Sequence, residues 1–140
     1  MALEDGDMDR ALEILDQKER GRPLEVKAVR FLASDQAGDP EARARMIREL
    51  EADPDGEARH PRSLPFFWLQ APDPFFDRLS LDAEENVGYV LDFLWYPHSR
   101  PLRRDPRFQA FARDQGMLEL WREHGWPDLC RPQGDGFSCE

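Results

Sequence analysis

The sequence predicts an all-α fold, with about seven helices packed as antiparallel hairpins in a short right-handed α-solenoid. Apolar residues recur at i, i+3 and i+4, which is the spacing of helices that bury one face. Glycine, proline and aspartate separate these stretches where helices would end and begin. The same punctuation also repeats 31 or 32 residues apart near the N-terminus. The recurring positions are Gly6-Asp7 with Gly38-Asp39, Ala11 with Ala42, and Pro23 with Pro54.

Three helices are predicted in the N-terminal part of the chain, over residues 8–20, 24–37 and 40–52. Asp39 is expected to cap the third helix, because its carboxylate can accept a hydrogen bond from a free backbone N–H. Pro40 suits the first helical position, where its missing N–H has no effect. If the spacing of 31 or 32 residues marks a helical repeat, the second and third helices form one complete hairpin. The first helix then lacks a partner helix.

The middle of the chain departs from a regular helix pair. Residues 63–81 contain three prolines among aromatic side chains, so we expect only two short helical turns, over 64–70 and 73–79. Asp82 is then predicted to cap a helix that continues to about residue 95.

Two short helices are predicted between residues 101 and 130. Asp105-Pro106 begins the first and Gly116 ends it, since glycine tolerates the left-handed conformation at a helix end. The second contains Trp121, which we expect to be a core anchor together with Met117, Leu118 and Leu120. We predict a single domain over 1–130, followed by a flexible tail over 131–140.

This C-terminal stretch contains an unusual series of proline, arginine, glycine and tryptophan positions: Pro101-Leu102-Arg103-Arg104-Asp105-Pro106-Arg107-Phe108, Gly116, Trp121, Gly125-Trp126-Pro127-Asp128 and Cys130. The series resembles a signature of bacterial tetratricopeptide-repeat-like proteins. In that family it closes a helical repeat array, often behind an N-terminal DNA-binding, cyclase or kinase module. The resemblance implies a scaffold for protein contacts and implies no chemistry.

Two groups of side chains are candidates for binding a protein partner. Four arginines within eight residues can bind an anion or an acidic segment, and the alternative is internal pairing with nearby carboxylates. An aromatic cluster can line an exposed groove, and the alternative is that it belongs to the core. The candidates are Arg100, Arg103, Arg104 and Arg107, and Phe66, Phe67 and Trp68.

The helix over 8–20 is also a candidate for self-association. Its apolar residues cover more than one narrow stripe, and by the repeat register it has no partner helix to cover them. A homodimer would bury this surface, with Met8, Leu12 and Ile14 at the interface.

Composition restricts the class of partner. The chain has 19 basic and 29 acidic side chains, a net charge of −10, and we therefore expect no nucleic-acid binding. This charge can attract a basic partner or simply keep the surface soluble. No run of about 18 apolar residues predicts a membrane span, and the acidic N-terminus lacks the features of a signal peptide. With two cysteines, Cys130 and Cys139, we expect reduced thiols and a cytoplasmic protein.

No pattern predicts an enzyme, a metal or a cofactor. Phosphate-loop, dinucleotide and kinase motifs are absent from the sequence. A zinc site formed by His124, Cys130 and Cys139 would lack paired CxxC spacing and a fourth ligand. We therefore predict a non-catalytic protein-interaction or scaffold domain. The alternatives are a regulatory or sensory tail of a bacterial signalling or transcription system, and a small hydrolase or metal-dependent enzyme.

Overall fold

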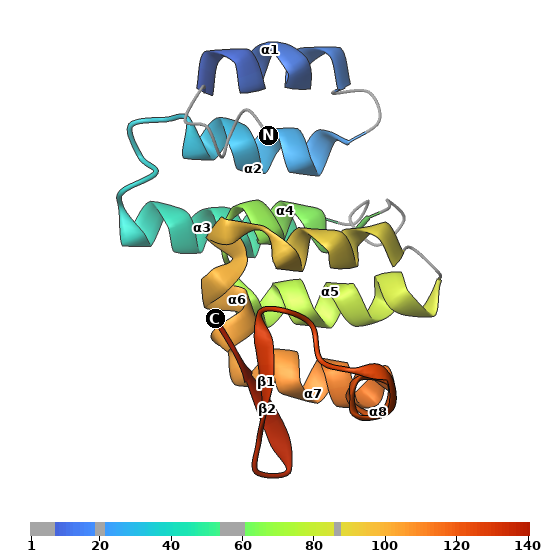
Figure 1. Cartoon of the computed structure of the whole chain (residues 1–140). Helices are drawn as coiled ribbons and strands as arrows, with labels where there is room; N and C mark the ends of the chain where they lie inside the picture. Colours follow the sequence, from blue (N-terminus) through green and yellow to red (C-terminus); the bar gives the residue numbers. More distant parts are fainter. Residues whose placement is uncertain (1–7, 19–21, 54–60, 86–87) are drawn as a thin grey trace. The chain divides into compact units, whose positions relative to one another are not determined.

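The computed structural model describes residues 8–18, 22–53, 61–85 and 88–140. The chain divides into two compact units, Met1–Val87 and Gly88–Glu140, where the sequence predicted one domain to residue 130. The described residues are mostly helical, and the elements are labelled in Figure 1. A two-stranded sheet is present as well, so the predicted all-α class is incomplete.

The first unit consists of five helices. Helix α2 lies between α1 and α3 (Figure 1), and it also packs on α4, which in turn packs on α5. The bounds are α1 Met8–Lys18, α2 Pro23–Leu32, α3 Pro40–Glu51, α4 Leu64–Trp68 and α5 Pro72–Glu84.

Local sequence explains several of these boundaries. The Asp39 carboxylate accepts a hydrogen bond of 2.9 Å from the Glu41 N–H at the start of α3, so the predicted cap is confirmed. The two helical turns predicted around the prolines correspond to α4 and α5, but α5 has 13 residues and continues to Glu84, beyond the predicted end at residue 79. The aromatic and aliphatic residues of these helices form a continuous core with α2 and α3, including Val26, Val29, Phe31, Leu50, Leu64, Phe67, Leu69, Phe75 and Leu79.

Asp82 does not cap a following helix, which corrects the prediction for this residue. It lies inside α5, is fully buried, and its carboxylate accepts hydrogen bonds from the backbone N–H groups of Arg62 and Ser63, both at 3.0 Å. The Ser63 hydroxyl donates a third bond at 2.6 Å. Asp82, which belongs to α5, therefore supplies the hydrogen-bond acceptor for backbone N–H groups at the start of α4.

The second unit begins where one long helix over 82–95 was predicted. That prediction is wrong, because α5 starts earlier, at Pro72, and ends at Glu84, and the following described segment is a 3₁₀ helix. The elements of this unit are η2 Gly88–Trp95, η3 Pro97–Ser99, α6 Arg100–Arg104, α7 Pro106–Asp114, α8 Met117–His124, β1 Cys130–Gln133 and β2 Gly136–Cys139.

The caps of α7 and α8 agree with the sequence. The Asp105 carboxylate accepts a 2.9 Å hydrogen bond from the Arg107 N–H, and Gly116 has φ +72° between the two helices. Trp121 is 9% exposed, as expected of a core residue. Leu120 is 54% exposed, so its predicted inward position is wrong.

The C-terminal residues form an antiparallel β-hairpin, which corrects the expectation of a flexible tail. Strand β1 pairs with β2 so that Cys130 lies opposite Cys139, and a disulfide joins the two residues. The expectation of reduced thiols is therefore also wrong. Phe137 of β2 is 2% exposed and packs its ring against Trp121 and Phe108, at centroid distances of 5.2 and 5.5 Å. This buried aromatic residue attaches the hairpin to the helices.

Candidate functional site

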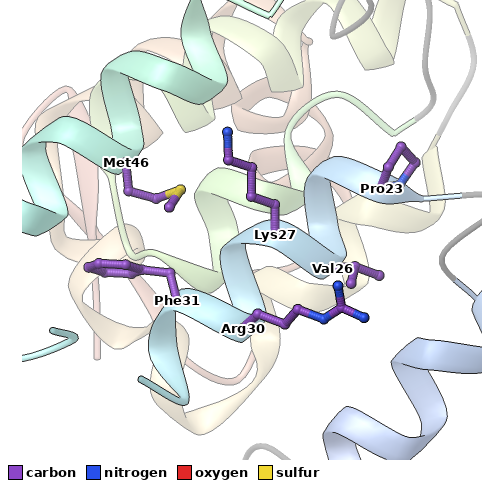
Figure 2. A pocket seen from close by; sticks show the side chains of 6 residues that line it. All are labelled: Pro23, Val26, Lys27, Arg30, Phe31 and Met46. Atoms are coloured by element: carbon purple, nitrogen blue, oxygen red, sulfur yellow. The ribbon is translucent and has the colours of Figure 1, made fainter. Parts of the chain in front are cut away.

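One hollow of the first unit lies along α2 on the side that faces α3. It has a volume of about 510 Å³, within the usual range for ligand sites. Figure 2 shows its lining, which comes from one face of α2 and from one residue of α3. The lining residues are Pro23, Val26, Lys27, Arg30, Phe31 and Met46, and we call this hollow the α2 groove.

Helical spacing explains the composition of the α2 groove. Val26 and Arg30 are four residues apart, and so are Lys27 and Phe31, so each line of side chains along this face of α2 pairs one apolar residue with one basic residue. Val26 and Phe31 are 1% and 7% exposed and form the floor. Met46 is half-buried on the α3 side, opposite the Phe31 ring (Figure 2).

Both cations at the rim form ion pairs with neighbouring helices. Lys27 Nζ lies 3.1 Å from the Glu49 carboxylate of α3, and Arg30 Nη2 lies 2.6 Å from the Asp16 carboxylate of α1. All four side chains are substantially exposed, so each pair contributes at most about 1 kcal/mol. A partner carboxylate can therefore replace Asp16 or Glu49 at little energetic cost.

The α2 groove combines an apolar floor with a cationic rim. An apolar side chain of a partner would displace water from Met46 and from the small exposed part of Phe31. A carboxylate one helical turn away on the same partner would reach Lys27 or Arg30. The arrangement suits an amphipathic acidic segment, and the sequence interpretation did not identify it. Its only signal in the sequence is the mixture of apolar and basic side chains on one face of α2.

The predicted arginine cluster is not a single binding surface. Arg103 is 5% exposed and donates hydrogen bonds to the backbone carbonyls of Leu94 at 2.6 Å, Tyr96 at 2.8 Å and Glu140 at 2.8 Å. Burial lowers the pKa of the Arg103 guanidinium, and the charges of Arg100 and Arg104 lower it further. Arg103 therefore holds η2 and the chain end together and is not accessible to a partner.

The other three arginines of that group are exposed. Arg100 and Arg104 lie on α6, and Arg107 lies in the first turn of α7. Asp105, one of the nearby carboxylates considered for internal pairing, accepts the backbone N–H of Arg107 and so caps α7. The exposed members, Arg100 and Arg104 above all, stay candidates for contact with an acidic partner.

The aromatic cluster belongs to the core. Phe66, Phe67 and Trp68 are 3%, 0% and 9% exposed, so they do not line an exposed groove. The Trp68 indole N–H donates a 3.0 Å hydrogen bond to the Glu25 carboxylate of α2, which fixes the position of its ring. The structure thus corrects the binding interpretation of these residues and supports the alternative of a core position.

The self-association residues lie on α1. Ile14 is 40% exposed and Leu12 is half-buried. The side chain of Met8 lies outside the part of the chain whose side chains are described.

Within the described ranges, no three or more His, Cys, Asp or Glu side chains are placed to hold a metal ion. In the same ranges, no helix is long and apolar enough to cross a membrane. A scan of family models, a search of curated proteins and a search of solved structures find no match to this chain.

Proposed function

We propose that this chain is a non-catalytic protein-interaction domain that binds an amphipathic acidic segment of a partner in the α2 groove. One observation carries the proposal: an open hollow combines an apolar floor with two cations, Lys27 and Arg30, whose exposed ion-pair partners a ligand carboxylate could replace. Protein sites that recognise helical segments use such hydrophobic grooves with charged rims.

The partner is expected to present one large apolar side chain and one carboxylate on the same face. The apolar side chain would lie over Val26 and Phe31, and Met46 can adjust to its shape because its thioether chain is flexible. The carboxylate would take the place of Glu49 at Lys27 or of Asp16 at Arg30. Charge reversal at the rim should therefore change which peptides bind.

We further propose that the first unit is related to tetratricopeptide-repeat arrays. The order α1, α2, α3 with contacts between successive helices supports this relation, since repeat helices contact their sequence neighbours. Helix α4, with five residues, is shorter than a repeat helix, and α2 packs on it. A regulatory segment of a signalling or transcription system would use the same groove, with its effector module as the partner.

The proposed interaction does not depend on the cellular compartment. A cytoplasmic location was expected from reduced thiols, and the disulfide between Cys130 and Cys139 removes that support. Disulfides persist mainly in oxidising compartments. Mass spectrometry of the protein from its natural source, with free thiols alkylated before lysis, would show which state it has there.

Peptide display tests the groove directly. A random peptide library panned against the whole chain should enrich sequences in which an apolar residue and an acidic residue are three or four positions apart. Met46→Glu should weaken binding of the selected peptides about tenfold or more, because it places a carboxylate at the apolar floor. Selection against Lys27→Glu should lose the preference for acidic residues, because the substitution reverses the charge at the rim.

Leu120→Glu is the matched control, since it introduces the same charge at an exposed apolar residue far from this groove in sequence. It should leave peptide affinity unchanged. If Met46→Glu and Leu120→Glu weaken binding equally, or if panning enriches no common pattern, the α2 groove is not a peptide site.

A further inference from the structure

Helix α1 holds a rim cation of the α2 groove although none of its described residues lines the groove. The lining residues belong to α2 and α3. Asp16 of α1 nevertheless reaches the rim, because its Oδ1 accepts a 2.6 Å hydrogen bond from Arg30 Nη2. Helix α1 can therefore affect a ligand at the rim without forming any described part of the apolar floor.

The other rim cation is held by a helix that belongs to the groove itself. Lys27 pairs with Glu49 of α3, and α3 also contributes Met46 to the lining. Ala42 and Leu50 of α3 are buried, so this helix is part of the core. A ligand carboxylate that displaces Glu49 from Lys27 would therefore leave α3 in place.

The attachment of α1 depends on more exposed side chains. The helix packs on α2, and none of the α1 side chains that the structure describes is buried. Leu12 is half-buried, and Ile14 is 40% exposed. The pair between Asp16 and Arg30 is therefore one of the contacts that attach α1, and it is a contact that a ligand carboxylate can break.

The sequence of α1 also has the pattern that we expect of a groove ligand. Leu12 and Asp16 are four positions apart, so they lie on the same face of the helix. A partner segment with an apolar residue and a carboxylate at this spacing would present the same two groups. Asp16 thus occupies Arg30 in the way that the carboxylate of a partner would.

We propose that α1 competes with the acidic segment of a partner, so that binding in the α2 groove and attachment of α1 weaken each other through Arg30. This inference rests on the function proposed for the groove and adds its regulation. A ligand carboxylate at Arg30 has to displace Asp16, so its binding is weaker than it would be without that pair. Because coupling between two binding events is reciprocal, the ligand weakens the attachment of α1 by the same factor.

The coupling should be small and should depend on charge. The side chains of Arg30 and Asp16 are 46% and 66% exposed, so their pair changes affinity by at most about fivefold, which corresponds to about 1 kcal/mol at 25 °C. In Figure 2 the side chains of Lys27 and Arg30 leave α2 in different directions, so one carboxylate contacts one cation or the other. A ligand without a carboxylate does not need Arg30, and α1 should not affect its affinity.

Two matched peptides test the coupling on the whole chain by nuclear magnetic resonance titration. Each is an alanine-based helix of about 15 residues that carries leucine and glutamate four positions apart, with this pair repeated after one heptad. The second peptide has glutamine in place of both glutamates. Asp16→Asn should raise the affinity of the glutamate peptide about two- to fivefold, because it releases Arg30. It should leave the affinity of the glutamine peptide unchanged.

Glu13→Gln is the matched control for Asp16→Asn. It makes an equal charge change at another exposed residue of α1, and it should leave the affinity of the glutamate peptide nearly unchanged. Hydrogen exchange of the α1 amides measures the reciprocal effect. The glutamate peptide at saturation should speed this exchange in the wild type by the same factor by which Asp16→Asn raises affinity. The glutamine peptide should not speed it, and neither should the glutamate peptide in Asp16→Asn.

Failure of this inference and failure of the groove give different results. If neither peptide binds the wild type or Asp16→Asn, the α2 groove is not a binding site, and the coupling is lost with it. If the glutamate peptide binds and Met46→Glu weakens its binding, but Asp16→Asn changes nothing, the groove stands and α1 is not a competitor. Equal gains in affinity from Asp16→Asn and Glu13→Gln would also overturn the inference, since they would show general repulsion by an acidic helix.

Discussion

At the scale of single residues, two buried polar side chains form hydrogen bonds with backbone groups. Asp82 collects N–H donors at the start of α4, and Arg103 collects carbonyl acceptors from η2 and the end of β2. The sequence pattern indicated a helix cap for the first and a surface cation for the second. Both interpretations used only neighbouring residues, whereas the groups that these side chains satisfy lie as far as 20 and 37 positions away. Partners at such separations depend on the fold and could not be predicted from local spacing.

Replacement of Asp82 by alanine should destabilise the protein by about 2–4 kcal/mol. The substitution leaves two backbone N–H groups and the Ser63 hydroxyl without their acceptor in a buried position. Urea unfolding followed by circular dichroism measures this loss. Asp77→Ala, an exposed position on the same helix, is the control and should change stability by less than about 0.5 kcal/mol. Equal effects of the two substitutions would show that the Asp82 hydrogen bonds contribute nothing to the free energy of unfolding.

At the scale of elements, the helices whose first residues are set by neighbouring residues in the sequence were predicted well. Helices α3 and α7 begin at Asp-Pro pairs, and the caps at Asp39 and Asp105 have the predicted geometry. The hairpin was missed because strands of only four residues carry little periodicity. Its stability comes from Phe137, which packs into the aromatic cluster of Trp121, Phe108 and Trp126, and from the disulfide.

The second unit should lose stability when the disulfide is removed. Cys130 and Cys139 are nine positions apart. Closing a loop of that length restricts the unfolded chain and stabilises the folded state by about 2.5–3 kcal/mol. Cys130→Ser/Cys139→Ser should therefore lower the unfolding midpoint in urea, and reduction of the wild type should lower it similarly. Reductant should leave the double variant unchanged. A wild type whose midpoint is equal with and without reductant would show that packing of Phe137 alone holds the hairpin.

At the scale of the whole molecule, charge is divided unevenly between the two units. The first unit carries 21 acidic and 12 basic side chains, and the second carries 8 and 7. The sequence indicated the helical class, because the spacing of apolar residues carries that information. It could not indicate the α2 groove, since this hollow combines residues of two helices and needs Met46 of α3 beside α2.

Self-association through α1 remains a prediction at this scale. Ile14 is 40% exposed and Leu12 is half-buried, so a second copy would remove apolar surface from water. Light scattering across a concentration series should show a rise in mass for the wild type. Leu12→Glu/Ile14→Glu should stay monomeric and folded. A wild type that stays monomeric, beside a variant that unfolds, would assign both residues to the internal core.

The disulfide also changes how the chain transmits mechanical force. A pull applied at Glu140 passes from Cys139 directly to Cys130, so residues 131–138 carry no tension while the bond is intact. When the second unit unfolds under load, these residues stay out of the stretched length. Reduction releases them, and eight residues extend to at most about 26–29 Å. The oxidation state of the two cysteines thus sets the length of chain that yields to force.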